Sequence, residues 1–467
     1  MELTPFPWAN LWLIAAIALI MGHCLYLQRH GRFFIFDPLM TFWGGYFICN
    51  VKQPFSYADT FVNWHSVQNF DLSTFLSFLG IVCVVVGYEM DLGQRLARKL
   101  PSSTRLLDPD RFFLSGLFLT ILGISCYYWL FQSAGGMWEW LSYGRGGTDY
   151  DKVNGYVREL EKFVPIGTYL LILHVEMHPV SRLRRALAWV FVALVWMWYL
   201  YLGTRSRIIG VGMLAASAYY VPKYRNPNFV FVVPAFIALI ILTNFQAHYR
   251  GNFTNLSFNL DKIDMEEAKA LCLPGFLGGD RELQHKEVSE GIDFNVLMAT
   301  VELVPDKVDY NYGWGFAEFV TRPIPKALWP DKIYPGLESW QGVLREGGLS
   351  TAQVADRDLV MGPAFNFAAF WYYILGPIAL IIGGLYSGVL FRTIRSYLDR
   401  DIHSESNVVI YNTLLIIGFS ESAATPFNWI FDFPLSSIIP LSILLYLCRQ
   451  NRNEGFTLPP MAEQGSQ

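Results

Sequence analysis

Charged residues are scarce in this chain of 467 residues, at 16% of the total. Soluble domains usually carry about 25%, so the shortage argues against a water-soluble protein, although the length alone would fit two or three soluble domains. The hydrophobic share is 53% and the mean hydropathy is +0.30. Repeated apolar runs of about 20 residues are each long enough to cross a bilayer. The net charge of −4 is too small to predict a nucleic-acid partner.

The sequence also lacks the motifs of several classes of protein. Its six cysteines show no CxxC or Cys/His spacing, so neither a disulfide framework nor a zinc site is predicted. No P-loop, HExxH or GxSxG pattern occurs, which leaves ATP and metalloprotease chemistry without support. No internal repeat is visible, which weakens a transporter built from inverted halves. We expect neither a metal nor a cofactor.

What the sequence does have is a succession of apolar runs, and they predict an all-α polytopic membrane protein with about eleven transmembrane helices. The start, MELTPFPWAN, lacks the basic region and cleavage site of a signal peptide, so we expect the first run to be retained. The predicted spans cover 9–27, 34–50, 72–89, 112–132, 163–177, 186–203, 208–222, 228–244, 364–390, 407–427 and 429–448.

The short loops predict the orientation of these spans. Basic segments follow the first, third, fifth, seventh, ninth and last spans, namely RHGR, QRLARKLPSSTR, SRLRR, PKYR, RTIRSYLDR and RQNR. Lys and Arg concentrate in cytoplasmic loops, so this alternation places the N-terminus outside and the C-terminus in the cytoplasm.

The same pattern divides the chain into four parts. Residues 1–245 hold spans one to eight, and residues 246–363 form a large outer loop that is expected to cap the bundle. Residues 364–448 hold the last three spans, and residues 449–467 form a cytoplasmic tail. Within the large loop, DFNVLMATVEL is typical of an amphipathic helix.

Several cations are predicted at the outer membrane boundary. Arg205, with Arg207 beside it, lies in the turn LYLGTRSRIIG, and His248 and Arg250 lie where the eighth span meets the large loop. A guanidinium there could bind a phosphate bidentately, or it could simply anchor the helix by snorkelling.

Two further segments could likewise either bind a ligand or anchor the chain at the membrane surface. The stretch VTRPIPKALWPDKIYPG combines Arg322 and Lys326 with prolines and a tryptophan, which fits either a binding segment or an anchored interfacial loop. Arg145 and Arg158 lie among aromatic residues in a stretch that suits sugar binding, although an interfacial aromatic belt has the same composition.

One acidic residue, Glu421, is predicted to lie inside the hydrocarbon region of the membrane. It lies in LLIIGFSESAATPFNW, about 21 Å from the cytoplasmic start of its helix. An unpaired carboxylate in hydrocarbon is costly, so Glu421 should pair with an arginine or line a wet cavity. It is either half of a structural ion pair or a general base for a hydroxyl nucleophile.

Taken in order, these segments resemble the oligosaccharide repeat unit polymerases, the Wzy class. The resemblance rests on RHGRFFIF, the LSY of the second outer loop, the GTR after the sixth span, HYRG after the eighth, RPIPKALWP in the large loop and Ser-Glu-Ser in the tenth span. One departure is Ser420, since the family commonly has a basic residue just before the acidic one.

The resemblance implies a bundle of the membrane glycosyltransferase (GT-C-like) type in a bacterial inner membrane. Such an enzyme joins glycan units carried on undecaprenyl pyrophosphate at the periplasmic face, without metal or nucleotide sugar. Arg205, Arg250 and Arg322 match basic positions that would meet the pyrophosphate, and Glu421 matches the acidic position. The implied partners are lipid-linked oligosaccharides, membrane lipid and a chain-length regulator protein.

Two alternatives stay open at the level of the sequence. An O-antigen ligase would share the fold and the leaving group and differ only in the acceptor. A transporter or flippase of lipid-linked saccharide would need polar residues through the whole membrane depth and broken helices at the midplane.

Overall fold

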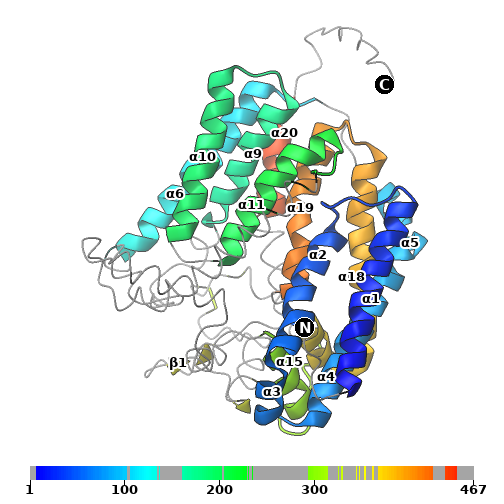
Figure 1. The fold of residues 1–467 in the computed structure, drawn as a ribbon. Coiled ribbons are helices and arrows are strands. Elements are labelled where there is room, and N and C mark those ends of the chain that lie inside the picture. Colours follow the sequence, from blue (N-terminus) through cyan, green and yellow to red (C-terminus); the bar gives the residue numbers. More distant parts are fainter. Residues whose placement is uncertain are drawn as a thin grey trace.

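The computed structural model describes residues 7–101, 106–133, 160–201, 205–228, 293–313, 366–423 and 437–449, with short pieces between 136 and 361. These residues are almost entirely helical (Figure 1). The one sheet in the described part pairs β1 (Ala352–Gln353) with β2 (Val360–Met361). The helices before residue 100 are α1 (Pro7–Arg29), α2 (Pro38–Phe47), the π-helix η1 (Ile48–Lys52), α3 (Gln53–Trp64), α4 (Val67–Glu89) and α5 (Asp91–Lys99).

The later helices complete the bundle. They are α6 (Pro109–Ser133), α9 (Phe163–Met177), α10 (Arg182–Tyr201), α11 (Arg205–Tyr220), the 3₁₀ turn η3 (Val221–Lys223), α15 (Asp293–Leu303), α18 (Phe367–Arg400), α19 (Glu405–Ala423) and α20 (Ile439–Leu447). Ten of the predicted spans overlap a described helix, although 34–50 begins before α2 and runs into η1. Most of the span at 228–244 and the first part of that at 429–448 lie outside the described residues, so the number of spans stays a prediction.

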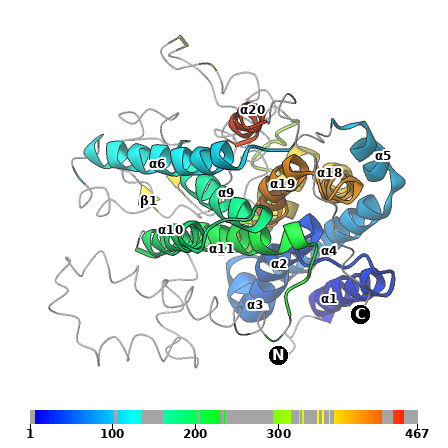
Figure 2. The same ribbon diagram turned by 90° about the horizontal axis from the view of Figure 1, so that it is seen from above.

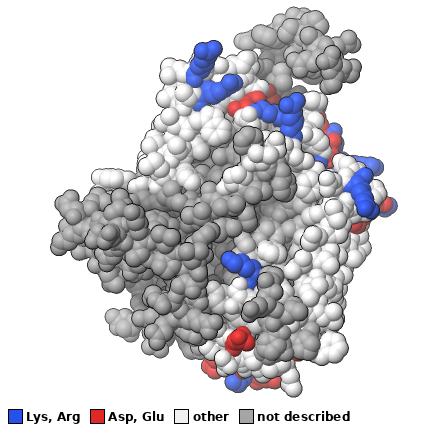
Figure 3. Space-filling view, viewed as in Figure 1, with Lys and Arg blue, Asp and Glu red and all other residues white. Residues whose placement is uncertain are grey.

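Four helices are long and apolar enough to cross a membrane, so the structure is that of an α-helical membrane protein. They are α1, α4, α6 and α18, and they were found among the described residues. Side chains such as Phe118 and Ile382 on these helices are more than half exposed, as hydrocarbon-facing residues would be. Most Lys and Arg side chains visible in Figure 3 lie at the upper end of the molecule, whereas Asp and Glu are visible at both ends. We call the upper end the basic end; α1 ends there at Arg29 and α18 at Arg400.

The helices form two groups that meet at α19. Seen from above in Figure 2, α6, α9, α10 and α11 form one group, and α1, α2, α4, α5 and α18 form the other. Helix α19 contacts α2 and α18 on one side and α9 and α11 on the other. A short polar contact joins α2 to α19, where the Thr41 hydroxyl lies 3.3 Å from the Leu415 carbonyl. Helix α19 is therefore packed between the two groups.

Glycines set the spacing between α4 and α18. A Cβ added at Gly388 would lie 2.1 Å from the Val84 carbonyl oxygen, and one at Gly87 would lie 2.3 Å from the Leu385 carbonyl oxygen. Both neighbours are backbone atoms, so the two helix backbones are in direct contact. Small residues are the usual means by which membrane helices gain close van der Waals packing where no hydrophobic effect drives association.

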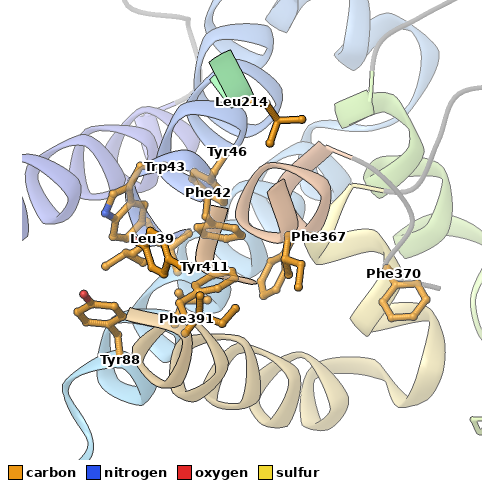
Figure 4. Packing of buried hydrophobic residues seen from close by; sticks show 14 of the residues in the cluster. Leu39, Phe42, Trp43, Tyr46, Tyr88, Leu214, Phe367, Phe370, Phe391 and Tyr411 are labelled. Carbon is orange, nitrogen blue, oxygen red and sulfur yellow. The ribbon is translucent and has the colours of Figure 1, made fainter. Parts of the chain in front are cut away.

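Aromatic rings fill the centre of the second group. Phe42 on α2 lies 5.3 Å from Phe367 and 5.4 Å from Phe391, ring centre to ring centre, and both partners belong to α18 (Figure 4). Trp43 and Tyr46 follow Phe42 on α2 and are also buried. These contacts fix α2 against α18, with α19 on its other side.

Helix α18 is broken, and a segment of the predicted large loop completes it. Leu375 and Gly376 leave the helical conformation just before Pro377, and the φ of Gly376 is +64°. Proline removes one helical hydrogen bond and crowds the preceding turn. The freed carbonyls of Tyr373 and Ile374 accept hydrogen bonds from the backbone N–H groups of Asn311 and Tyr312, at 3.0 and 2.9 Å.

Helix α15 begins the same loop segment and packs against α18 and α4. The prediction of a helix at DFNVLMATVEL is confirmed. Its expected amphipathic character is wrong, because residues 294–301 are buried on every side of the helix. His65, just after α3, lies 2.5 Å from Glu302 and 2.6 Å from Asn295, so two polar side chains of α15 meet one imidazole. This part of the loop is thus built into the bundle.

We predict that Gly388→Ala destabilises the protein by about 1–3 kcal/mol, because α18 must move away from α4 to admit the methyl group. The measurement is the unfolding temperature in detergent, followed by intrinsic fluorescence. Gly22→Ala is the matched control, since a Cβ at Gly22 of α1 would meet no atom within 4 Å. Equal unfolding temperatures for the two variants would contradict the tight α4–α18 contact.

Candidate functional site

Arg205 and Glu421 lie at the same end of two helices in contact. Arg205 is the first residue of α11 and Glu421 is close to the end of α19. The two helices run in opposite directions: η3, which follows α11, contacts α19, while α19 begins at Glu405, near His178 and the start of α10. Both residues are therefore at the ends of α11 and α19 that point away from the basic end.

Phe36 contacts both α11 and α19, so it marks a common height on the two helices. Tyr220 stacks on Phe36 with ring centres 5.8 Å apart, and the Tyr411 hydroxyl donates to the Phe36 carbonyl at 2.5 Å. From this level Arg205 lies about 22 Å along α11, and Glu421 lies about 15 Å along α19. The backbone of the predicted cation thus lies more than one helical turn further from this level than that of the predicted acid, on a neighbouring helix.

The remaining predicted site residues lie outside the described residues. They are Arg145, Arg158, His248, Arg250, Arg322 and Lys326. The description of Arg205 and Glu421 is limited to their backbone positions. The grouping of Arg205 with Arg250 and Arg322 around a pyrophosphate therefore stays a prediction.

A second group of polar residues, which the sequence did not single out, is buried at the basic end. Arg395 of α18 is at its centre, with a side chain 5% exposed, and its Nε lies 3.8 Å from Asp37, whose side chain is 2% exposed. Arg395 also pairs with Asp399 at 3.0 Å and donates to the Tyr224 hydroxyl. We call these residues, with Tyr88 and Tyr411, the Arg395 cluster.

Hydrogen bonds within the Arg395 cluster link helices that are far apart in the sequence. The Tyr88 hydroxyl at the end of α4 donates to Asp37 at 2.6 Å, and Asp37 caps α2 by accepting from the Leu39 N–H. Tyr224, just after η3, donates to Asp399 at 2.8 Å. Partial burial raises the pKa of Tyr224 to about 12, so this phenol stays protonated and remains a donor.

The cluster is a structural device rather than an open binding site. Buried charges are tolerated when they are paired and hydrogen-bonded, and here the pairing joins α2, α4, α18 and η3. Asp37 directly before Pro38 was a recognisable helix start. Arg395 and Asp399 are spaced as neighbours on a helix. The sequence had assigned RTIRSYLDR to a basic turn, because its charges end the apolar run, whereas the structure continues α18 to Arg400.

One open cavity of about 380 Å³ lies beside the cluster. Its lining residues are Pro222, Lys223, Tyr224, Asp399, Ile402 and His403. All of them belong to the basic end, so this cavity is separate from the end where Arg205 and Glu421 lie. In the part of the chain that the structure describes, no three His, Cys, Asp or Glu side chains are grouped to hold a metal.

Comparison with known proteins adds no further assignment. No family model matches the chain, and neither a curated protein nor a solved structure matches it.

We predict that Arg395→Met lowers the free energy of unfolding by about 3–5 kcal/mol, because it leaves the Asp37 carboxylate buried without its cation. Adding Asp37→Asn should restore part of that loss, since the uncompensated charge disappears. Thermal unfolding of the single and double variants in detergent measures both effects.

Arg392→Gln is the matched control for this prediction. Arg392 is one turn earlier on α18, is half-buried and lies over the Tyr88 ring at 5.5 Å. Its replacement removes a cation without exposing a buried partner, so the loss should be smaller. Strictly additive losses in the double variant would show that Arg395 and Asp37 do not depend on each other.

Proposed function

We propose that this protein is a membrane glycosyltransferase that polymerises undecaprenyl-pyrophosphate-linked oligosaccharide repeat units into a surface polysaccharide. The proposal includes about eleven spans in a bacterial inner membrane, a periplasmic N-terminus and a cytoplasmic C-terminus. The observation that carries it is the position of Arg205 and Glu421 at the same end of α11 and α19. The resemblance of the sequence to repeat unit polymerases gives these two residues their roles.

In this reaction the acceptor hydroxyl attacks the anomeric carbon of the donor glycan. A glycosidic C–O bond forms, the bond from the anomeric carbon to the phosphate oxygen breaks, and undecaprenyl pyrophosphate leaves with the bonding electrons. Negative charge grows on the leaving oxygen, so fixed guanidinium groups stabilise the transition state more than the ground state. Arg205, Arg250 and Arg322 would supply these groups.

Glu421 would receive the proton of the acceptor hydroxyl. A carboxylate within hydrogen-bond reach of that hydroxyl can act as its general base. A polymerase that holds both lipid carriers in the membrane needs this base and the cations at one membrane boundary. The levels of Arg205 and Glu421 on adjacent helices are compatible with that need.

We predict that Arg205→Ala and Arg250→Ala each slow polymerisation by about 10²–10³-fold, the usual loss when one charge-stabilising donor is removed. The variants are expressed in cells that lack the native gene, and glycan length is read on gels beside an immunoblot of membrane levels. Normal long-chain glycan from well-expressed variants would remove both residues from the mechanism.

Arg207→Ala is the control for Arg205. It removes a cation from the same turn of α11, at a position about 200° around the helix from Arg205. Deletion of the gene distinguishes a polymerase from a ligase, which differ in their acceptors. Single repeat units attached to the final acceptor indicate a polymerase, whereas finished polymer left on the lipid carrier would indicate a ligase.

A further inference from the structure

Helix α5 follows α4 directly at the basic end and has one face fixed to α18. A Cβ at Gly93 would lie 2.7 Å from Cβ of Arg392, and Ala97 is also buried. Nη1 of Arg400 donates to the carbonyls of Ala97, Arg98 and Leu100 at 3.1, 3.3 and 2.7 Å. These bonds satisfy carbonyls that a helix end leaves without partners. The helix is therefore held firmly, with its other faces outward at the edge of the bundle (Figures 1 and 2).

A row of leucines covers the second face of α5. Leu92, Leu96 and the C-cap residue Leu100 are 51%, 40% and 44% exposed. At 3.6 residues per turn they lie within an arc of about 80°. Three exposed leucines at this spacing form a continuous apolar strip, which is costly to leave in water.

The end of α4, which directly precedes α5, also exposes apolar side chains. Val86 and Met90, at the end of that span, are 49% and 43% exposed. Helix α4 is long and apolar enough to cross the membrane, so its exposed side faces hydrocarbon. Exposed apolar side chains thus occur both at the end of α4 and, two residues after Met90, at the start of the leucine row.

The third face of α5 is basic. Arg95, Arg98 and Lys99 are exposed and lie within an arc of about 100° on the side away from Gly93 and Ala97. No ion pair or side-chain hydrogen bond joins them to another residue in the part of the chain that the structure describes. Three cations beside an apolar row match the composition of helices that bind anionic membrane surfaces.

We infer that α5 is an interfacial helix that binds anionic phospholipid in the leaflet at the basic end. Its leucine row enters the boundary between headgroups and acyl chains, and its three cations contact lipid phosphates. Its Gly93–Ala97 face keeps it on α18, so the bound lipid lies against the helix that carries Arg395. This inference does not depend on the proposed enzymatic activity.

The test uses the full chain in nanodiscs of phosphatidylcholine with a minor share of phosphatidylglycerol. A photoreactive diazirine residue replaces Leu96, and mass spectrometry identifies what it crosslinks. We predict adducts with phospholipid in which phosphatidylglycerol is enriched over its bulk share. One positive charge near an anionic surface changes affinity by about fivefold, so Arg95→Gln/Arg98→Gln/Lys99→Gln should return the adducts to the bulk ratio while lipid adducts persist.

Ile121 of α6 is the matched control position. It is 54% exposed in the middle of a span, so a diazirine residue there should give lipid adducts at the bulk ratio. Adducts from position 96 to protein, or none to lipid, would overturn the interfacial placement of α5. Lipid adducts without enrichment in wild type, or enrichment that survives the triple variant, would overturn the binding of anionic headgroups by its cations.

Discussion

The ion pair of Arg395 and Asp37 is the contact on which the arrangement of the bundle depends. A buried guanidinium needs several acceptors at once, and these come from separate elements, so their ends must converge. Asp37 starts α2, Tyr88 closes α4, and Tyr224 follows α11 and η3. Because helices are stiff, fixing their basic ends also fixes the heights that they reach at the other end.

Close backbone contacts along the helices keep them at these heights. Glycines bring α4 and α18 into backbone contact, and α19 does the same with the start of α2, where a Cβ at Gly418 would lie 2.0 Å from the Pro38 carbonyl oxygen. Helix α19 cannot slide along α2 without separating from it. Since α19 also contacts α11, the height of Glu421 relative to Arg205 follows from packing at a distance from both residues.

Hydropathy located the long apolar helices, because each span must bury or expose apolar side chains over the bilayer thickness. It missed α3 and α5, and α5 overlaps QRLARKLPSSTR, which the sequence had assigned to a basic loop. It was a poor guide to their ends. Helix α18 passes the last apolar residue of its predicted span and continues to Arg400, since its charged turns are covered by α5 and by the Arg395 cluster. Pro377 was a visible signal of a break, but nothing local in the sequence shows that Asn311 and Tyr312 complete it. The roles of Arg205 and Glu421 rested on resemblance and on their distance along a helix.

The repair of α18 by main-chain groups has a consequence for sequence variation in the large loop. Asn311 and Tyr312 contribute backbone N–H groups to the break, so the hydrogen bonds themselves make few demands on side-chain identity. Proline is the exception, because it has no N–H to offer, and an insertion would move the donors out of register with the two carbonyls. Homologous chains should therefore vary in residue type at these two positions while keeping their number of residues and avoiding proline.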